Sequence, residues 1–226
     1  MVETAQQITP RTTTDVVFDH LREQILSLQL LPGTRISEAD IANKLGVSRQ
    51  PVRDAFNRLG NLNLLRIRPQ RATIVSGFSI SQILNTRFIR LAVELEVARH
   101  AHRTWTNRST EAIEAVLDLQ RSAIKAGQID TFHRLDYDFH GLICTLGGQP
   151  LAFETIENCK QQVDRLCVLS LSKAEEVSAV LSDHEEIANA LEKKSFETVE
   201  AVLRSHLGRL DATISDIYKK HAEYFE

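Results

Sequence analysis

The sequence predicts a mostly α-helical protein: an N-terminal winged helix-turn-helix with a small β-hairpin wing, followed by an all-α bundle of about six helices. Its 226 residues are 42% hydrophobic but only 6% aromatic, a composition that favours helices over a β-sandwich. Short helical patterns and two β-rich runs fill the first third of the chain, and long amphipathic patterns fill the rest. We therefore expect a winged-helix domain over residues 1–78 and a helical domain over residues 79–226.

Charge differs between these two parts of the chain. Residues 1–78 contain ten Lys and Arg against seven Asp and Glu, although the whole chain has a net charge of −3. The basic excess in residues 48–71 favours binding to a polyanion, but a solvated basic surface explains it equally well. The three cysteines form no C-x-x-C pair, and no stretch approaches the roughly 18 apolar residues that a membrane span needs. We expect a cytoplasmic protein that inserts into no membrane.

The first helix is predicted over residues 15–29. Its apolar stripe consists of Val17, Leu21, Ile25 and Leu28, and the run 31–33, Leu-Pro-Gly, ends it because proline and glycine interrupt helices. Residues 1–13 before it are polar and show no such stripe, so we expect them to be flexible.

The next two helices form a predicted helix-turn-helix. Ser37 opens the first of them as its N-cap, and Gly46 ends it. Ser48 is the expected cap of the second, whose apolar residues again recur at helical spacing. Two β-rich runs, 64–68 and 72–76, surround the sequence Pro-Gln-Arg and predict the hairpin wing.

The N-terminal end of the later helix carries side chains that suit the major groove of DNA. In a helix-turn-helix the second helix of the pair enters this groove by its N-terminal end. Arginine can bond a guanine edge and glutamine an adenine edge, while serine and arginine also contact phosphates. The candidate DNA-binding residues are Arg35, Ser48, Arg49, Gln50, Arg53 and Arg71, of which Arg35 and Arg71 are placed to meet phosphates.

The run 31–56, which reads LPGTRISEADIANKLGVSRQPVRDAF, resembles the winged-helix domain of the GntR family of bacterial transcription regulators. The resemblance implies operator contacts from Arg35, Arg49, Arg53 and a residue of the wing. Asn63 and Ala72 stand where the family usually has glycine. Asn63 can still adopt a left-handed helix cap, so the fold should survive, whereas Ala72 would change how the wing meets the minor groove and is not counted as a contact.

Six helices are predicted after a short linker at residues 77–79. The first begins with a capping sequence at Ser79 and runs to about Trp105, with a buried stripe of Ile83, Phe88, Leu91, Leu95 and Ala98. The others are expected at roughly 110–126, 130–147, 150–172, 174–194 and 196–224. Asp130, Ser182 and Ser195 are the predicted N-caps among them.

One aspartate and three histidines of this domain form a candidate metal site. Asp136 and His140 lie four residues apart on one helix face, and His184 and His206 lie on the apolar stripes of two later helices. A single histidine on an apolar stripe is more often an ordinary core residue with one hydrogen-bond partner. Together, however, imidazole and carboxylate groups form a ligand set for a divalent Zn, Ni, Co, Mn or Fe ion.

The same four residues resemble the D-x-x-x-H, H-x-x-I and H-L marks of the FadR C-terminal (FCD) domain, the effector domain of one GntR subfamily. The resemblance implies that Asp136, His140, His184 and His206 hold a metal, which in turn ligates a small organic acid. The R-x-x-L-E mark of that domain matches residues 90–94 and implies that Arg90 pairs with a ligand carboxylate. A solvated Arg90, or one bonded to Glu94, is an equally open alternative.

These resemblances imply a one-component regulator that binds an inverted-repeat operator as a homodimer. Its expected partners are double-stranded operator DNA, a small carboxylate metabolite and a second copy of the chain. The alternative is a metal-dependent hydrolase or other metalloenzyme fused to a DNA-binding module, because a metal with open positions could activate water. The sequence contains no H-E-x-x-H motif, which a metal-dependent hydrolase could use as ligands and general base, so the regulator is the preferred hypothesis.

Overall fold

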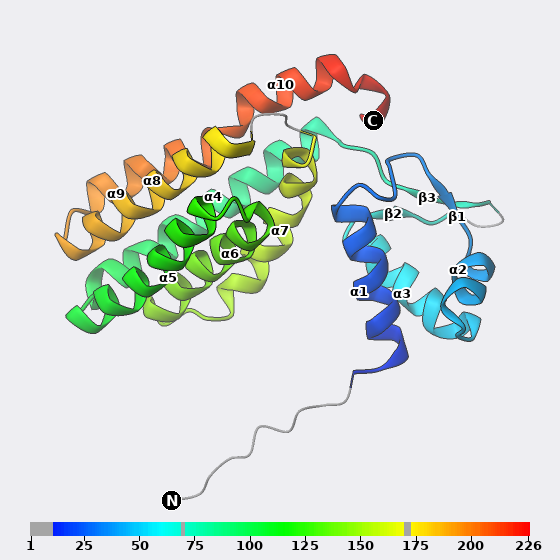
Figure 1. Ribbon diagram of the computed structural model, residues 1–226, viewed down its shortest axis with the longest axis horizontal. Helices are drawn as coiled ribbons and strands as arrows, with labels where there is room; N and C mark the ends of the chain where they lie inside the picture. Colours follow the sequence, from blue (N-terminus) through cyan, green and yellow to red (C-terminus); the bar gives the residue numbers. More distant parts are fainter. Residues whose placement is uncertain (1–10, 69–70, 170–172) are drawn as a thin grey trace, which may run out of the picture. The chain divides into compact units, whose positions relative to one another are not determined.

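The computed structural model describes residues 11–68, 71–169 and 173–226 (Figure 1). The chain forms two compact units: an N-terminal unit of residues 1–78 together with Glu226, and a helical unit of residues 79–225. Each unit has its own hydrophobic core and is described separately. Within the described ranges, no helix is long and apolar enough to cross a membrane.

Three helices build the N-terminal unit: α1 (Thr13–Leu26), α2 (Glu38–Leu45) and α3 (Arg49–Asn61). Helix α1 begins earlier than predicted because of a capping box. The Thr12 hydroxyl accepts a hydrogen bond from the backbone N–H of Asp15, and the Asp15 carboxylate accepts from the backbone N–H of Thr12. The last residue of the segment that we expected to be flexible therefore lies in the first turn of α1.

Helix α1 also ends earlier than predicted, at Leu26 instead of residue 29. Leu28, which was predicted to lie on its apolar stripe, lies outside the helix with a left-handed φ of 60°, a conformation that cannot continue an α-helix.

The ends of the other helices in this unit follow the predicted signals with one exception. The Ser37 hydroxyl accepts from the backbone N–H of Asp40, and Gly46 ends α2 with a φ of 66°. Ser48 occupies the N-cap of α3, but its side chain makes no cap hydrogen bond, although we expected one. Asn63 adopts a φ of 57°, so the left-handed conformation predicted after α3 is confirmed.

Three short strands form an antiparallel sheet in the order β1-β3-β2: β1 (Arg35–Ile36), β2 (Leu65–Arg66) and β3 (Thr73–Val75). Strands β2 and β3 are the predicted wing hairpin. Strand β1 was not predicted, because a strand of two residues leaves no alternating pattern in the sequence. The hairpin tip predicted at residues 69–70 lies outside the described part of the chain.

A single core joins these elements. Helix α1 packs along α3, and the strands contribute Ile36, Leu65 and Val75 to the same cluster. The inner stripe predicted for α3, with Val52 and Phe56, is buried as expected. This packing fixes the start of α3 relative to the wing, which positions the candidate DNA-binding residues.

Seven α-helices form the helical unit within the described ranges: α4 (Ile80–Thr104), α5 (Asn107–Lys125), α6 (Ile129–Leu146), α7 (Ala152–Cys167), α8 (Lys173–Glu192), α9 (Phe196–Gly208) and α10 (Leu210–Lys220), followed by the 3₁₀ helix η1 (Ala222–Tyr224). The prediction of about six helices is one short, because the expected helix over 196–224 is interrupted at Arg209. Two features favour the interruption. Gly208 is a poor helix former, and the Arg209 guanidinium is held by Asp183 of α8.

Two of the three N-caps predicted for the helical unit are wrong. Helix α8 begins at Lys173, so Ser182 lies inside it, and Asp130 lies within the first turn of α6. Ser195 is the N-cap of α9, as predicted. Glu185, which lies three residues after Ser182 as in a capping box, instead accepts a hydrogen bond from Arg121 of α5 at 2.7 Å.

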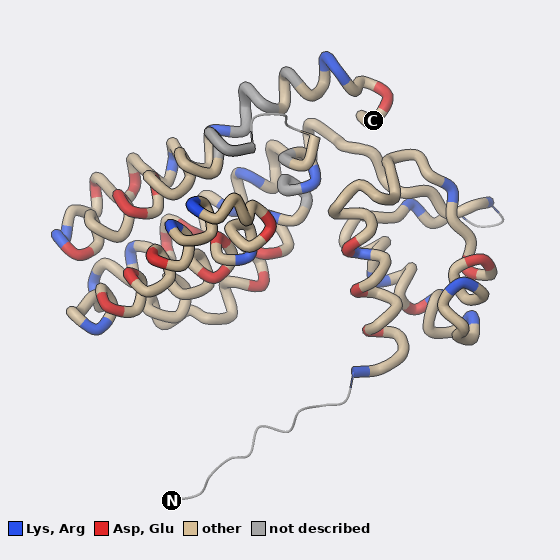
Figure 2. The backbone as a smooth tube through the Cα atoms, viewed as in Figure 1, with Lys and Arg blue, Asp and Glu red and all other residues tan. Residues whose placement is uncertain are grey.

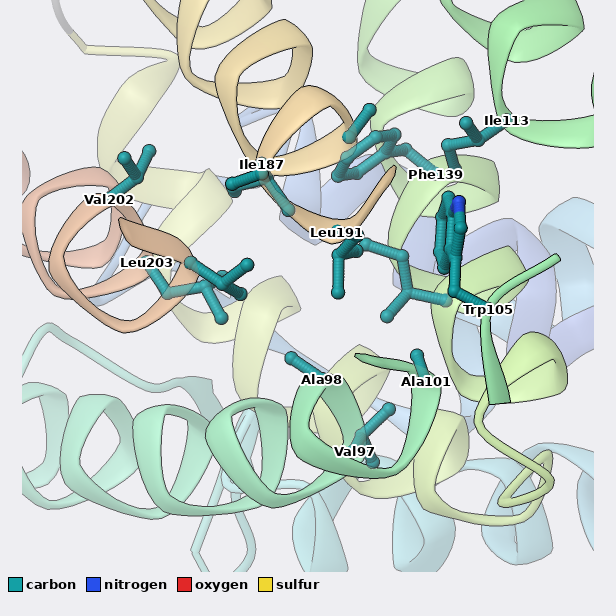
Figure 3. Close-up of a cluster of buried hydrophobic side chains, with 14 of the residues drawn as sticks. Val97, Ala98, Ala101, Trp105, Ile113, Phe139, Ile187, Leu191, Val202 and Leu203 are labelled. Carbon is teal, nitrogen blue, oxygen red and sulfur yellow. The ribbon is translucent and has the colours of Figure 1, made fainter. Parts of the chain in front are cut away.

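The core of the helical unit lies between α4, α5, α6, α7, α8 and α9. Figure 3 shows its side chains, among them Val97, Ala98, Ala101, Trp105, Ile113, Phe139, Ile187, Leu191, Val202 and Leu203. The C-terminal end of α6 approaches α4 closely at Gly147, where a Cβ atom would lie 2.8 Å from the carbonyl oxygen of Val97. Glycine is therefore required at this contact.

The prediction of a buried apolar stripe on α4 is only partly correct. Ile83 and Ala98 are buried, but Phe88 is 73% exposed. Ile80 and Leu84 are also exposed and lie at helical spacing from Phe88, so α4 carries a row of apolar side chains on its surface. We call Ile80, Leu84 and Phe88 the apolar row of α4.

Candidate metal centre and nucleic-acid interface

The four predicted metal ligands meet inside the helical unit. Asp136 and His140 come from α6, His184 from α8 and His206 from α9. One ligand atom of each lies within 4.8 Å of the others, and all four residues are buried. Spacing of four residues brings the two α6 side chains to one face, and the packing of α6 on α8 and of α8 on α9 adds the rest.

The His140 ring is oriented by a glutamate that precedes it in the chain. Its Nδ1 lies 2.8 Å from Oε2 of Glu94. Burial raises the pKa of the Glu94 carboxyl, but the charge of Arg90 and the hydrogen bond from His140 outweigh burial and hold this pKa well below its usual value. An ionised carboxylate can only accept, so the His140 proton lies on Nδ1 and the lone pair of Nε2 faces the cluster.

The His184 ring is oriented by Gln120 of α5. The Gln120 Nε2 donates to the carbonyl oxygen of Leu135 at 2.9 Å, which turns its Oε1 toward His184 Nδ1 at 3.0 Å. Burial lowers the pKa of His184 to about 3, so the imidazole is neutral at pH 7. Its proton therefore lies on Nδ1, and Nε2 is an acceptor directed into the cluster.

His206 follows the same arrangement. Its Nδ1 lies 3.2 Å from Oδ2 of Asp183, and Arg209 donates to both oxygens of Asp183 at 2.5 and 2.6 Å. Asp183 is thus held ionised and in place, and it leaves Nε2 of His206 for the cluster. Each of the three histidines has its Nδ1 bound by an acceptor from a different helix, which is the outer hydrogen bonding typical of metal-binding histidines.

Asp136 presents one oxygen to the histidines. Its Oδ2 is bound by the ammonium group of Lys160 of α7 at 2.5 Å, while its Oδ1 lies 3.2 Å from Nε2 of His184 and 3.7 Å from Nε2 of His140. Burial raises the pKa of the Asp136 carboxyl, but the charge of Lys160 outweighs burial and holds this pKa well below its usual value. The carboxylate is therefore ionised.

This donor set fits a divalent cation. Within the described residues, Nε2 of His184 is buried without a hydrogen-bond partner, although Oδ1 of Asp136 lies 3.2 Å away. Both atoms are acceptors, so their approach is repulsive unless a cation lies between them. Three imidazole nitrogens and one carboxylate oxygen would suit Zn, Ni, Co, Mn or Fe.

Arg90 reaches this cluster from α4. Its side chain is buried, its Nε donates to Oε1 of Glu94 at 2.5 Å, and one terminal nitrogen lies 3.1 Å from Nε2 of His140. The alternative of a solvated Arg90 is therefore wrong, and the alternative of a pair with Glu94 is correct. The predicted contact with a ligand carboxylate stays a prediction.

Four residues bind the cluster in ways that were not predicted: Gln120, Lys160 and Asp183 were not candidate site residues, and Glu94 was expected only as a possible partner of Arg90. Gln120 follows Ile113 and Leu117 on the buried stripe of α5, so an amide at a core position was a usable signal. Lys160 lies one turn after the buried Ile156 and is a similar signal. Asp183 left none, because its contact with His206 depends on how α8 and α9 pack.

The six candidate DNA-binding residues are all on the surface of the N-terminal unit. Ser48, Arg49 and Gln50 begin α3, and Arg35 lies on β1. Lys and Arg positions follow α3 and the sheet in this unit (Figure 2). The start of α3 and the strands thus carry the basic groups that the sequence indicated.

Two of these side chains are held by neighbouring acids. Arg53 bonds Glu38 of α2, with nitrogen–oxygen distances of 3.1 to 3.3 Å. Gln50 donates to Asp54 at 3.0 Å, one turn further along α3. Both pairs are exposed and would be weak in water, so each side chain can exchange its acid for a nucleic-acid group.

A winged helix-turn-helix joined to a helical unit with a buried Asp-His₃ cluster defines a class of DNA-binding regulator. Residues 13–75 match the family described as bacterial regulatory proteins, gntR family, and residues 86–209 match the FCD domain. The chain belongs to the GntR family of bacterial regulators and carries an FCD domain.

Relatives agree with this assignment. The HTH-type transcriptional repressor RspR of Escherichia coli (strain K12) is 36% identical over 92% of each chain. The gluconate operon transcriptional repressor of Bacillus licheniformis is 24% identical over 88% of this chain and 83% of that protein. The solved structure of E. coli McbR/YncC shares the fold, with a TM-score of 0.73 and 22% identity over 94% of this chain and 100% of that one. The protein is therefore a transcriptional regulator, and not the metalloenzyme of the alternative hypothesis.

Proposed function

We propose that this regulator binds an inverted-repeat operator as a homodimer in the bacterial cytoplasm and is switched by a small organic acid. The acid would bind beside a divalent metal held by Asp136, His140, His184 and His206. The observation that carries the proposal is the approach of His184 Nε2 to Asp136 Oδ1, two buried acceptors that a cation would join.

The N-terminal unit supports operator binding through the exposed start of α3. Arg49 and Gln50 have the chemistry to read guanine and adenine edges, and Arg53 can read a base or contact a phosphate. Arg35 and Arg71 would contact phosphates, as would the Ser48 hydroxyl at the N-terminus of α3. One recognition helix reads few base pairs, so two related by symmetry would give the specificity that an operator requires.

The apolar row of α4 supports a homodimer. A contiguous set of large apolar side chains on a soluble surface commonly marks a protein contact. A second copy would cover Ile80, Leu84 and Phe88 by presenting the same residues across a twofold axis.

The switch requires that the acid bind two arrangements of the dimer with different affinity, since an equal affinity shifts no equilibrium. Arg90 would bind the carboxylate, and the metal would bind it on the other side. The chain's own ligands span α6, α8 and α9, so a change in their spacing would alter the packing of these helices. RspR is named as a repressor, which makes repression the first direction to test.

The variant His206→Ala tests the metal-dependent switch. It removes one of four ligands, so it should lose bound metal and its response to the acid while it stays folded and binds operator DNA. Metal content by mass spectrometry, thermal unfolding and operator binding with a panel of small carboxylates measure these properties. His133→Ala is the matched control, because His133 lies on α6 outside the cluster. A His206→Ala protein that responds like the wild type would contradict the proposal.

A further inference from the structure

We propose that Arg90 and the metal ion exchange at one atom, Nε2 of His140, so that metal loading directs Arg90 toward an anionic ligand. This inference rests on the metal site proposed above and adds a coupling between the two binding steps. It makes the regulator respond to a carboxylate only when the metal is present.

Arg90, Glu94 and His140 form a closed ring of hydrogen bonds. Glu94 accepts from Arg90 Nε through one oxygen, at 2.5 Å, and from His140 Nδ1 through the other, at 2.8 Å. The ring closes where a terminal nitrogen of Arg90 lies 3.1 Å from Nε2 of His140. Because His140 carries its proton on Nδ1, Nε2 has one lone pair, and Arg90 donates to it.

A metal ligated by His140 needs the same lone pair. One lone pair of a neutral imidazole binds either an N–H donor or a metal, so the two are mutually exclusive at this atom. Nε2 is the only ring nitrogen of His140 that faces Asp136, since Nδ1 is bound to Glu94. The contact with Arg90 therefore competes directly with metal binding.

Arg90 would stay at the site after it leaves His140. Its side chain is 8% exposed, and its Nε is bound to Glu94, whose own side chain is 5% exposed. Only the terminal end of the guanidinium would be released, and this end has N–H groups in a planar fork that matches a carboxylate. An anionic ligand beside the metal could thus take the donor that His140 gives up.

The exchange predicts a positive coupling between metal and carboxylate. Without an anion, the metal must break the hydrogen bond from Arg90 to His140, and this cost weakens metal binding. With an anion, the terminal N–H of Arg90 that leaves His140 bonds the anion instead, so the cost of breaking that bond is smaller. Linkage then requires that the metal raise the affinity for the anion by the same factor.

The test is Zn²⁺ binding to the metal-stripped full-length protein, measured by competition with a chromophoric chelator in the absence of carboxylates. Arg90→Gln and Arg90→Lys should both bind Zn²⁺ about tenfold more tightly than the wild type, the factor expected when a charge-assisted hydrogen bond to the ligand is lost. Arg90→Lys keeps the positive charge but lacks the fork that spans Glu94 and His140. Tighter binding by Arg90→Gln alone would mean simple charge repulsion and would overturn the proposal.

Arg209→Gln is the matched control. Arg209 also supports the cluster from outside, through Asp183, but it contacts no ligand nitrogen. This variant should not tighten Zn²⁺ binding, and an increase equal to that of Arg90→Gln would also overturn the proposal. Failure of the wild type itself to bind Zn²⁺ or the other candidate ions would overturn the metal site and this inference together. Equal Zn²⁺ affinity in the wild type and both Arg90 variants would overturn this inference alone.

A structural readout completes the test. In protein labelled with ¹⁵N-arginine and ¹⁵N-histidine, Zn²⁺ should shift His140 Nε2 and the terminal Arg90 signals in parallel, whereas the Arg90 Nε signal should keep its bond to Glu94. Arg90→Lys identifies the Arg90 signals. Terminal Arg90 signals that do not move while His140 Nε2 shifts would contradict the exchange.

Discussion

At the scale of single residues, the proposed metal centre depends on where three protons lie. Glu94, Gln120 and Asp183 each accept from Nδ1 of one histidine, and this leaves three Nε2 atoms toward Asp136. The acceptors differ in charge: Glu94 and Asp183 are carboxylates, whereas Gln120 is a neutral amide. A carboxylate makes an imidazole a stronger donor to a metal than an amide does. His184 should therefore be the weakest of the three histidine ligands.

Gln120 provides a prediction at this scale. Replacing it with Leu removes the acceptor of His184 and leaves the Leu135 carbonyl without its donor, so Zn²⁺ affinity should fall by about 10- to 100-fold. Gln120→Glu keeps an oxygen near Nδ1 and should retain Zn²⁺ binding. Chelator competition measures the affinities, and circular dichroism shows whether each variant is folded. A folded Gln120→Leu protein with wild-type Zn²⁺ affinity would mean that Gln120 has no role in orienting His184.

At the scale of elements, the position of α6 decides whether the ligands meet. Asp136 and His140 lie on α6, and its C-terminal end touches α4 at Gly147. The predicted helix over 130–147 agrees with both ends of α6 within one residue, because helical periodicity marks its length and two glycines, at 147 and 148, follow it. The sequence did not predict the contact with α4, since a glycine at a helix end is equally compatible with a solvated turn.

Gly147→Ala and Gly141→Ala form a matched pair on this helix. The added Cβ of Gly147→Ala would lie 2.8 Å from the backbone oxygen of Val97, so the variant should lose about 1–3 kcal/mol of unfolding free energy. At Gly141 the Cβ would lie 3.4 Å from the ring of Phe153, an ordinary contact, and alanine also favours a helix. Urea unfolding measures both. Equal stability of the two variants would show that α6 and α4 can separate at no cost.

The interruption between α9 and α10 is also decided at this scale. The apolar stripe of residues 196–224 predicts one continuous helix. In the structure Arg209 binds Asp183, the residue that orients His206, so the interruption lies three residues after His206 of the candidate metal site. The start of α10 at Leu210 therefore directly follows Arg209, which contacts the cluster through Asp183.

At the scale of the whole molecule, the apolar row of α4 is exposed in the single chain, although large apolar side chains are normally buried. The helical spacing of apolar residues predicts that Phe88 is buried. Phe88 does lie on a helix, α4, as this spacing predicts. The structure places Phe88 at the surface, where burial of a side chain of this size by a second copy would contribute roughly 2 kcal/mol per chain.

If the proposed homodimer forms through this row, Phe88→Glu should convert it into a monomer and weaken operator binding. Sedimentation velocity measures the oligomeric state, and a gel-shift assay measures DNA binding. Leu151→Glu is the control, since Leu151 is 86% exposed and lies just before α7, away from the apolar row. A Phe88→Glu protein that stays dimeric would place the interface elsewhere, and loss of the dimer in both variants would indicate a general effect of added charge.

The sequence by itself determined the two-part architecture, the helix-turn-helix with its wing and the four metal-ligand candidates. These features follow from local rules, because helix periodicity, caps and turns act over a few residues, and because Asp136, His140, His184 and His206 match a dense motif. Only the tertiary structure decided which acceptors orient the histidines, that Lys160 binds Asp136, that Arg90 reaches His140 and that Phe88 is exposed. Each of these depends on how helices distant in the chain pack together, and such contacts leave no periodic trace in the sequence.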